Sequence, residues 1–335
     1  MEPVRFGIIS TAKIALDRVI PAMLQGEHTK IVAIASRDLA KAKAAAEQFG
    51  IPKAYGSYDD LLADPEIEAV YNPLPNHLHV PVSIDAAKAG KHVLCEKPIA
   101  LDAKEATTLI DARDTAGVTI AEAFMVRHHP QWHKARELVR DGRIGDLRVI
   151  QASFSYMNVD PDNVRNQAGI GGGGLYDIGC YPIVTSRFIF GTEPVRAIGL
   201  LERDPAFQTD RLCSAILHFP EGQAQFICST QLVPQQRMQI LGTTGRIDLD
   251  IPFTPLSDET SRILVDDGSH RGFQSSEEFI FQGVNQYTLQ GDQFARVVRG
   301  EASLDFPLED AAKNMAVIDA LYRSGSSGDW ETVHG

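Results

Sequence analysis

The residues of this chain most suited to chemistry surround Lys97, which lies between a glutamate and a proline. The run Lys91-His92-Val93-Leu94-Cys95 precedes Glu96, Lys97 and Pro98. A lysine that leaves a buried parallel strand lies at the edge of the sheet where open α/β folds bind their ligands, and its ammonium group can exchange a proton. The proline also restricts the backbone of the residue before it. We therefore predict that Lys97 belongs to an active site.

The segments around Lys97 alternate between strand and helix. Short apolar runs have the length of buried strands at residues 5–9, 30–36, 69–72, 92–95 and 118–123. Helical stretches separate them: one ends at Gly50, and another begins at Asp102, with Glu105 in the spacing of a capping box. Alternating strands and helices imply a parallel sheet with right-handed crossovers. We predict an N-terminal Rossmann domain, a doubly wound parallel sheet, over residues 1–123.

The second part of the chain, residues 124–335, has a different pattern. Strand-like segments follow one another, mostly with turn residues between them, at residues 148–156, 195–202, 211–219, 223–231, 236–241 and 246–250. Strands without intervening helices indicate a large, mostly antiparallel open sheet. Helices are expected near residues 286–299 and 308–323, and the C-terminal helix can pack back on the first domain. The fold class predicted for the chain is α/β, with a second domain of the α+β type.

Composition excludes several classes of protein. The 335 residues suffice for about two domains, and the net charge of −12 argues against binding to nucleic-acid phosphates or anionic membranes. No apolar stretch is long enough to span a bilayer. The cysteines have no CxxC spacing and lie in or beside apolar runs, which is typical of reduced thiols in the cytoplasm; they are Cys95, Cys180, Cys213 and Cys228.

The turn after the first strand has the position of a G-x-G-x-x-G motif. It reads Ser10-Thr11-Ala12-Lys13-Ile14-Ala15, with small residues in place of the three glycines. Small residues permit a tight turn and a close approach of the backbone to a pyrophosphate, which the N–H groups at the helix start would bind. An ordinary turn between strand and helix is the alternative, because serine and threonine also start helices.

The end of the second strand indicates which dinucleotide would bind. An NAD site usually has an acidic residue there for the ribose 2′-hydroxyl, whereas this chain has Ser36 and Arg37. A hydroxyl and a guanidinium suit a 2′-phosphate. We predict NADP(H) as the cofactor. Alternatively, Arg37 is solvated while Asp38 caps the next helix, and the two interpretations are compatible.

Three further motifs accompany the Lys97 motif: Pro73-Leu74-Pro75-Asn76-His77-Leu78-His79, residues 123–130 with Arg127, and residues 171–181 with four glycines, Asp177 and Tyr181. Together, in order and spacing, these motifs resemble the Gfo/Idh/MocA oxidoreductases over essentially the whole chain. The Ser10–Ala15 turn, the Ser36-Arg37 pair and Tyr181 resemble most the branch of NADP-dependent D-xylose dehydrogenase and dihydrodiol dehydrogenase. Many family members have histidine where this chain has Tyr181.

The resemblance implies an NADP-dependent enzyme that transfers hydride between nicotinamide and the C1, or another secondary, hydroxyl of an aldopyranose such as D-xylose or D-glucose. One alternative is an NADPH-dependent reductase of a keto-sugar or dicarbonyl, similar to 1,5-anhydrofructose. A second alternative, of another class, is a non-catalytic regulator of the same fold that senses NADP or sugar. The resemblance also implies a homodimer or homotetramer formed through the C-terminal sheet, and gives residues 124–335 the binding of substrate and of partner subunits.

The chemistry of such a site can be argued from the residue types. Oxidation of an alcohol needs a base, and a tyrosine with a pKa of about 10 becomes one when a nearby ammonium stabilises tyrosinate. Lys97 can do this for Tyr181 or accept the proton itself. Asp177 lies four residues before Tyr181, on the same helix face one turn apart, in a helix that Gly179 and Pro182 are expected to bend. It can orient a hydroxyl or the lysine. Alternatively, Tyr181 is a half-buried aromatic residue of a helix, Asp177 is an acidic residue at a helix start, and Lys97 is a solvated residue at a strand end.

These arguments give a set of candidate site residues. The catalytic candidates are Lys97, Asp177 and Tyr181. The cofactor candidates are Ser10, Thr11, Ala12, Lys13, Ile14, Ser36, Arg37, Leu74, Asn76, His79, Glu96 and Lys97. The substrate candidates are Lys97, Arg127, Asn163, Arg165, Asp177 and Tyr181. We predict no metal, because the closely spaced histidines His77, His79, His129 and His133 have no cysteine or carboxylate at ligand spacing.

Overall fold

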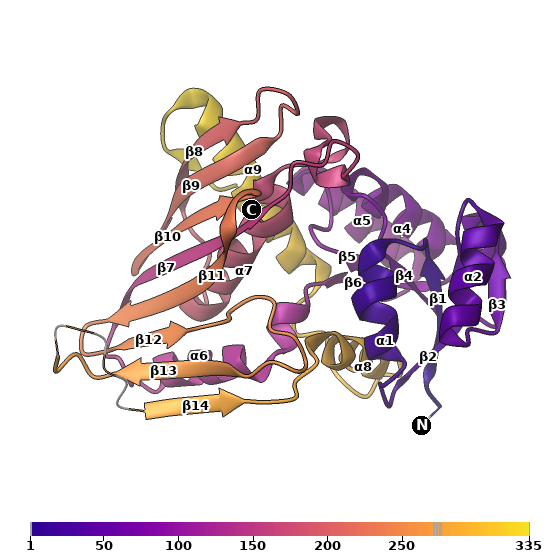
Figure 1. The fold of residues 1–335 in the computed structure, drawn as a ribbon, viewed down its shortest axis with the longest axis horizontal. Coiled ribbons are helices and arrows are strands. Elements are labelled where there is room, and N and C mark those ends of the chain that lie inside the picture. The colour runs from indigo at the N-terminus through magenta and orange to yellow at the C-terminus, as the bar shows by residue number, and fades with distance from the viewer. Residues whose placement is uncertain (1, 271, 273, 275–276, 335) are drawn as a thin grey trace. The chain divides into compact units, whose positions relative to one another are not determined.

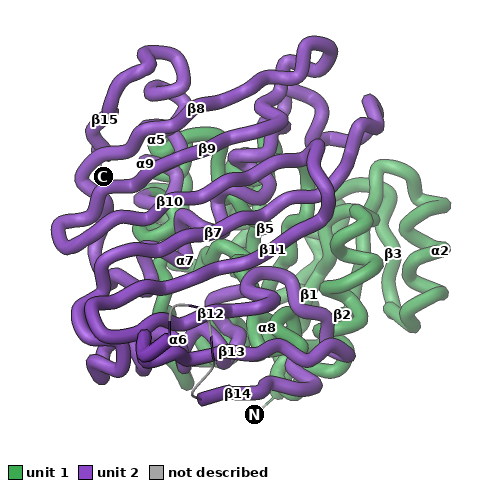
Figure 2. The backbone as a smooth tube through the Cα atoms, turned by 60° about the vertical axis from the view of Figure 1, so that its left-hand side comes forward, with its two compact units in different colours: residues 1–125, 285–312 green, residues 126–284, 313–335 purple. Residues whose placement is uncertain are grey.

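The chain forms two compact units, which Figure 2 colours separately. The structure, a computed structural model, describes residues 2–270, 272, 274 and 277–334. Unit 1 comprises Met1–Met125 and Asn285–Ala312, and unit 2 comprises Val126–Val284 and Lys313–Gly335. In the described part of the chain, no helix has the length and apolarity needed to cross a membrane.

Unit 1 is built on a parallel sheet of six strands in the order β3-β2-β1-β4-β5-β6 (Figure 1). The strands are β1 (Val4–Ile9), β2 (Thr29–Ala35), β3 (Lys53–Tyr55), β4 (Ala69–Asn72), β5 (His92–Glu96) and β6 (Ile120–Ala123). This order is that of a dinucleotide-binding Rossmann fold, and its direction reverses between β1 and β4, where such folds bind ligands. Five of these strands correspond to the predicted runs; β3 was missed because its three residues carry no apolar pattern.

Helices connect the strands of unit 1 and cover the sheet: α1 (Ile20–Met23), α2 (Leu39–Phe49), α3 (Tyr58–Leu62), α4 (His79–Lys88), α5 (Ala103–Ala116) and α8 (Gln286–Val298). Local chemistry sets their ends. Asp38 and Asp102 accept backbone N–H bonds at the starts of α2 and α5, and Gly50 and Gly117 end these helices with positive φ angles of 67° and 66°. The side chain of Phe294, from α8, lies in the same core as the side chains of β1 and β4.

Unit 2 is built on a sheet of nine strands in the order β14-β13-β12-β11-β7-β10-β9-β8-β15. The strands are β7 (Leu147–Met157), β8 (Arg196–Arg203), β9 (Asp210–Phe219), β10 (Gly222–Ser229), β11 (Gln231–Gly242), β12 (Arg246–Leu249), β13 (Ser261–Asp266), β14 (Glu277–Phe281) and β15 (Glu331–Thr332). Their pairings are antiparallel except for that of β7 with β10. The predicted α/β class and the mostly antiparallel second sheet are confirmed.

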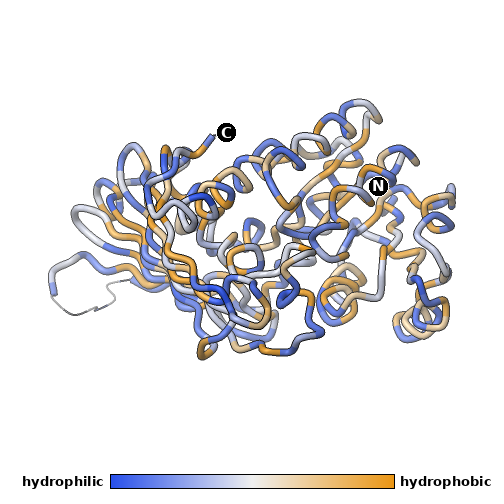
Figure 3. Tube along the Cα trace, turned by 90° about the horizontal axis from the view of Figure 1, so that it is seen from above, coloured by the Kyte–Doolittle hydropathy of each residue, from blue (hydrophilic) through white to orange (hydrophobic). Residues whose placement is uncertain are grey.

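One face of the nine-stranded sheet is buried and the other is open. Side chains alternate between the two faces, and the tube in Figure 3 shows the corresponding alternation of hydropathy. On β9, for example, Cys213, Ala215 and Leu217 are buried, whereas Ser214 is exposed. The helices of this unit are α6 (Pro130–Arg140) and α7 (Cys180–Phe190), together with most of α9 (Leu308–Ser327), which begins in unit 1.

Helix α7 lies wholly in the interior, with every residue from Cys180 to Ile189 buried. An aromatic cluster packs beside its first turn: the ring of Phe253 lies 5.0 Å from Phe154, 5.7 Å from Tyr181 and 6.3 Å from Trp132. This cluster fixes the side chain of Tyr181 from two sides. Part of the hydrophobic core of unit 2 therefore surrounds a candidate site residue.

Candidate functional site

The turn after β1 has the backbone that a glycine would favour, although its residue is serine. Ser10 has a φ angle of 86°, and its N–H donates to the carbonyl of Ala35 at the end of β2 (3.0 Å). The next residues, Thr11, Ala12 and Ile14, are partly buried, and Lys13 is exposed. A π-helical turn (Ala15–Val19) then leads into α1. A tight turn of small residues at the carboxyl edge of the sheet fits the pyrophosphate of a dinucleotide.

After β2, the side chain of Arg37 is exposed to solvent, whereas that of Asp38 caps the next helix. The carboxylate of Asp38 accepts from the N–H of Ala40 (2.9 Å), and the Ser36 hydroxyl accepts from the N–H of Asp38 (3.2 Å). Arg37 is exposed. The two interpretations of this segment are therefore compatible in the structure: Asp38 caps α2, and Arg37 is available to an anion. Because the carboxylate of Asp38 caps α2 and a hydroxyl and a guanidinium precede it, the residues fit a 2′-phosphate better.

The segment after β4 is joined to the Lys97 motif through His79. Its imidazole lies 2.7 Å from the carbonyl oxygen of Leu74 through Nε2 and 2.7 Å from that of Pro98 through Nδ1. Burial lowers the pKa of His79 to about 4, against the opposing effect of these two carbonyls. Asn76 begins a short 3-10 helix (Asn76–Leu78) just before His79. The neutral imidazole has a single N–H and donates it to one of these carbonyls, with the ring lying between the two loops of the sheet edge.

Lys97 follows β5 directly and is partly buried, and its peptide bond to Pro98 is cis. Hydrogen bonds fix the chain on both sides of it. The buried hydroxyl of Tyr71 donates to the carboxylate of Glu96 (2.6 Å), and the carboxylate of Glu122 accepts from the N–H of Ile99 (3.0 Å). Burial and the charge of Glu96 hold the pKa of Tyr71 well above its usual value, so its hydroxyl remains a donor.

In unit 2, Asp177 and Tyr181 lie where a π-helical turn (Leu175–Gly179) continues into α7. The helix is irregular here, because the π-helical turn has a wider winding than an α-helix. Pro182, three residues into α7, has no N–H for the carbonyl of Ile178. Tyr181 is 4% exposed, and its ring packs edge-on against Phe154 at 5.4 Å.

Asp177 is clamped by two side chains. Its carboxylate accepts a hydrogen bond of 2.5 Å from the hydroxyl of Tyr156 and pairs with the guanidinium of Arg165 at 2.9 Å. The Asp177 charge raises the pKa of Arg165, and burial together with the same charge raises the pKa of Tyr156. Two predicted substrate residues, Arg165 and Asp177, are therefore brought into contact.

Tyr156 is the member of this cluster that sequence reasoning missed. It lies on β7 two residues after Phe154, so strand alternation places both side chains on the covered face. The two-residue period of the strand was thus the sequence signal that could have identified Tyr156. Of the other substrate candidates, Asn163 accepts the N–H of Arg165 within a short turn (3.1 Å), and Arg127 is 4% exposed.

No group of three or more His, Cys, Asp and Glu side chains with the arrangement of a metal site occurs among the residues that the structure describes. His129 accepts the N–H of Gln131 at the start of α6, and His133 packs against the ring of Phe188. The four cysteines, all in the described part of the chain, are buried thiols without a disulfide bond.

A Rossmann sheet with a small-residue turn, an arginine after β2 and a lysine after β5 defines a dinucleotide-dependent oxidoreductase. Two family models match the chain: an oxidoreductase family with an NAD-binding Rossmann fold over residues 4–124, and the GFO/IDH/MocA C-terminal domain over residues 132–248. The chain therefore belongs to the GFO/IDH/MocA oxidoreductase family.

Similar proteins cover nearly the whole chain. The uncharacterized oxidoreductase ORF334 of Rhizobium meliloti is 50% identical over 99% of this chain and 100% of its own length. The D-xylose 1-dehydrogenase (NADP(+)) 2 of Haloferax volcanii is 36% identical over 96% of this chain and 98% of its own. Among solved structures, KijD10, a 3-ketoreductase from Actinomadura kijaniata in complex with NADP and TDP-benzene, is 30% identical, covers 96% and 98% of the two chains and has a TM-score of 0.90.

These comparisons confirm four predictions. They are the family, the branch that contains D-xylose and dihydrodiol dehydrogenases, the assignment as an oxidoreductase enzyme, and NADP(H) as the cofactor.

Proposed function

We propose that this enzyme transfers hydride between NADP and the C1, or another secondary, hydroxyl of an aldopyranose such as D-xylose or D-glucose. The observation that carries the proposal is the position of Lys97 at the carboxyl end of β5. This strand lies beside β4, next to the point where the strand order reverses, and hydrogen bonds of Glu96 and Ile99 fix the backbone around the lysine. The similarity to a D-xylose 1-dehydrogenase supports the choice of sugar.

Unit 1 would hold the cofactor. The backbone N–H groups of the turn over residues 10–14 would bind the pyrophosphate, and Ser36 and Arg37 the 2′-phosphate. Leu74, Asn76, His79 and Glu96 complete the proposed set, with His79 acting through the loops it joins. When bound, the nicotinamide accepts or donates the hydride.

Lys97 and Tyr181 would handle the proton. When the alcohol is oxidised, its hydroxyl proton passes to Tyr181 or to Lys97, and the ammonium group stabilises the tyrosinate form. Asp177 would align the hydroxyl through the ion pair with Arg165, with Arg127 and Asn163 as further contacts of unit 2. The hydrogen bond from Tyr156 keeps the Asp177 carboxylate in one orientation, which serves preorganisation.

The reverse reaction is the second candidate. KijD10, to which the chain is similar over nearly its whole length, is a 3-ketoreductase, and this favours an NADPH-dependent reductase of a keto-sugar or dicarbonyl. The regulator alternative is not carried further, because the comparisons identify an oxidoreductase.

A substrate panel tests both candidates. Aldoses are offered with NADP+ and NAD+ side by side, and keto-sugars with NADPH. NADPH formation from aldoses supports the dehydrogenase, whereas turnover of keto-sugars alone selects the reductase. Arg37→Asp is expected to weaken NADP+ relative to NAD+ by about ten- to hundredfold; an unchanged ratio would exclude Arg37 as the phosphate partner.

The proton step has its own variants. Lys97→Ala and Tyr181→Phe should each lower kcat by roughly 10²–10⁴-fold, while NADPH affinity, measured by fluorescence titration, changes far less. Lys104→Ala is the matched control, since Lys104 is an exposed lysine of α5. A kcat close to that of the wild type in either variant would refute the proposed proton relay between Lys97 and Tyr181.

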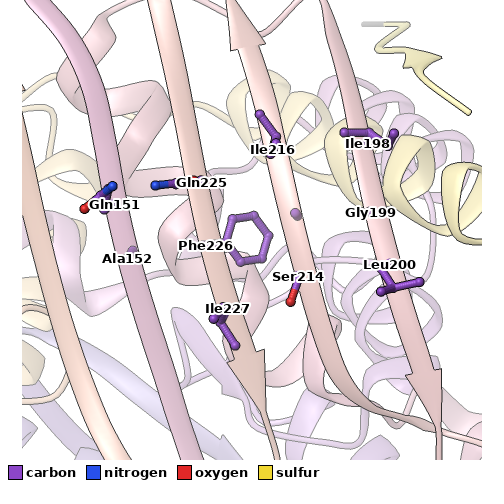
Figure 4. A pocket seen from close by; sticks show the side chains of 11 residues that line it. Gln151, Ala152, Ile198, Gly199, Leu200, Ser214, Ile216, Gln225, Phe226 and Ile227 are labelled. Atoms are coloured by element: carbon purple, nitrogen blue, oxygen red, sulfur yellow. The ribbon is translucent and has the colours of Figure 1, made fainter.

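The open face of the nine-stranded sheet is proposed to pair with a second copy of the chain. It has a shallow hollow of about 560 Å³ on neighbouring strands β7, β10, β9 and β8 (Figure 4). Leu200 is 77% and Ile227 46% exposed there, beside the amides of Gln151 and Gln225. Apolar side chains among polar groups are typical of interfaces.

Light scattering tests this assembly, which we propose to be a homodimer or homotetramer. Leu200→Asp with Ile227→Asp should give monomers, whereas Leu24→Asp, at an exposed leucine of unit 1, should leave the mass unchanged. A wild-type monomer would refute the interface. We also propose a cytoplasmic location, supported by the four buried cysteines, which form no disulfide bond among the described residues.

A further inference from the structure

Asp210, the first residue of β9, joins three elements of unit 2 through one carboxylate. It is 1% exposed. One oxygen accepts the N–H of Leu175, the first residue of the π-helical turn, at 2.6 Å, and the other accepts the hydroxyl of Tyr322, from α9, at 2.9 Å. The carboxylate thus connects the sheet, the last helix and the turn that carries Asp177.

The glycine run before this turn is shaped by the same carboxylate. A Cβ atom at Gly173 would lie 2.1 Å from Oδ1 of Asp210, and Gly173 has a φ angle of 128°. A Cβ atom at Gly172 would lie 2.7 Å from the carbonyl oxygen of Arg165. Glycine is therefore required by close approach at two successive positions. The chain enters the π-helical turn along a path that Asp210 and the segment of Arg165 define.

The position of the carboxylate suits this arrangement, because its two oxygens accept hydrogen bonds from different elements. A carboxylate at the start of a helical turn stabilises N–H groups that have no partner within the helix. Burial raises the pKa of Asp210 to about 6, and the groups near it are Tyr322, Arg203 and Cys228. Tyr322 also packs against Tyr176, with ring centroids 5.1 Å apart, so this residue of α9 contacts both the π-helical turn and Asp210.

We propose that Asp210 is a positioning residue for the active site, which holds the start of the turn so that Asp177 and Tyr181 keep their places. The inference rests on the proposed function, because it assigns Asp177 and Tyr181 to the reacting groups. Asp210 itself acts through Leu175 and the glycine run. In sequence it is an ordinary polar residue at a strand start, and only the fold brings it within hydrogen-bond distance of a residue 35 positions away.

Hydrogen exchange of the protein tests the proposal without depending on turnover. In Asp210→Ala, the amides of residues 173–179 should exchange about tenfold faster or more, because a hydrogen bond to a buried charge is lost. Asp210→Asn, which keeps an oxygen acceptor for the N–H of Leu175, should show a smaller increase. Tyr322→Phe, which removes only the other hydrogen bond, provides a variant that keeps the carboxylate.

Asp204→Ala is the matched control. Asp204 is also a buried aspartate of unit 2 that accepts backbone N–H bonds, from Ala206 (2.8 Å) and Phe207 (2.9 Å), within another loop. It should leave exchange over residues 173–179 unchanged. Exchange in that segment equal to wild type in both Asp210 variants overturns the proposal, as does an equal increase in Asp204→Ala. If Asp210→Ala does not fold, Asp210→Asn and Tyr322→Phe decide by the same criterion.

Kinetics then separate positioning from a general loss of structure. Asp210→Asn should lower kcat about five- to fiftyfold while leaving NADPH affinity at the wild-type value. A weakening of NADPH binding as large as the fall in kcat would refute a positioning role. A wild-type enzyme without turnover on the sugar panel would contradict the proposed function, whereas the exchange result would still decide whether Asp210 holds the turn.

Discussion

The burial of Asp210 predicts a dependence of stability on pH that one substitution removes. Its pKa rises from 3.8 to about 6 in the folded protein. The folded state therefore binds this proton more tightly than the unfolded state, so the contribution of Asp210 to stability is greatest below about pH 4 and decreases as the pH rises toward 6. Each pH unit between the two pKa values corresponds to about 1.4 kcal/mol, so the ionised carboxylate lowers the free energy of unfolding by about 3 kcal/mol at neutral pH.

The perturbation is Asp210→Asn, which retains the shape of the side chain and does not titrate. The difference in unfolding free energy, variant minus wild type, should increase by about 2–3 kcal/mol between about pH 4 and pH 7. Contributions of other groups cancel in this difference. His128 and His129, whose pKa values burial lowers to about 4, act on both proteins alike.

Urea unfolding followed by tryptophan fluorescence is the suitable assay. The chain has two tryptophans, Trp132 and Trp330, and both belong to unit 2, the unit of Asp210. Asp204→Asn is the control: hydrogen bonds hold the pKa of Asp204 below its usual value, so its difference curve should be flat across this range. A flat curve for Asp210→Asn as well would refute the reasoning, since the carboxylate would then titrate as if exposed.

Three further predictions concern single contacts. Gly173→Ala should lower the unfolding free energy of unit 2 by about 2–4 kcal/mol, because its Cβ would meet Asp210, whereas Gly169→Ala, with open space around it, should change it by under about 0.5 kcal/mol; equal effects in urea unfolding would contradict this. Tyr71→Phe removes a 2.6 Å hydrogen bond to Glu96 and should destabilise unit 1 by about 1–2 kcal/mol, seen as faster hydrogen exchange in β4 and β5; unchanged exchange would count against the contact. Tyr156→Phe frees one side of Asp177 and should lower kcat about five- to fiftyfold with NADPH affinity retained, and a wild-type kcat would exclude a role in orienting the carboxylate.

Much of the fold could be predicted because its signals are local. Alternating apolar runs and helical stretches indicated a parallel sheet, and Asp102 and Gly50 marked helix ends where the structure has them. In the second half of the chain, successive strand-like segments without helices between them predicted an antiparallel sheet. The strand β13 and its neighbour β14 were not anticipated, because β13 lies in a segment rich in Ser, Asp and Gly, a composition typical of a loop.

The sequence by itself determined the alternation of strands and helices around Lys97. It also determined that Lys97, the small residues of the Ser10 turn and Arg37 follow strand ends, because apolar runs mark where the strands stop. Tertiary structure alone decided the partners of Asp177: the hydroxyl of Tyr156, 21 positions away, and the guanidinium of Arg165. It also decided that the turn carrying Asp177 is π-helical and that the N–H of its first residue, Leu175, donates to the carboxylate of Asp210. Hydrogen bonds between distant residues leave no periodic trace in a chain, since they depend on how strands and helices pack and not on local propensity.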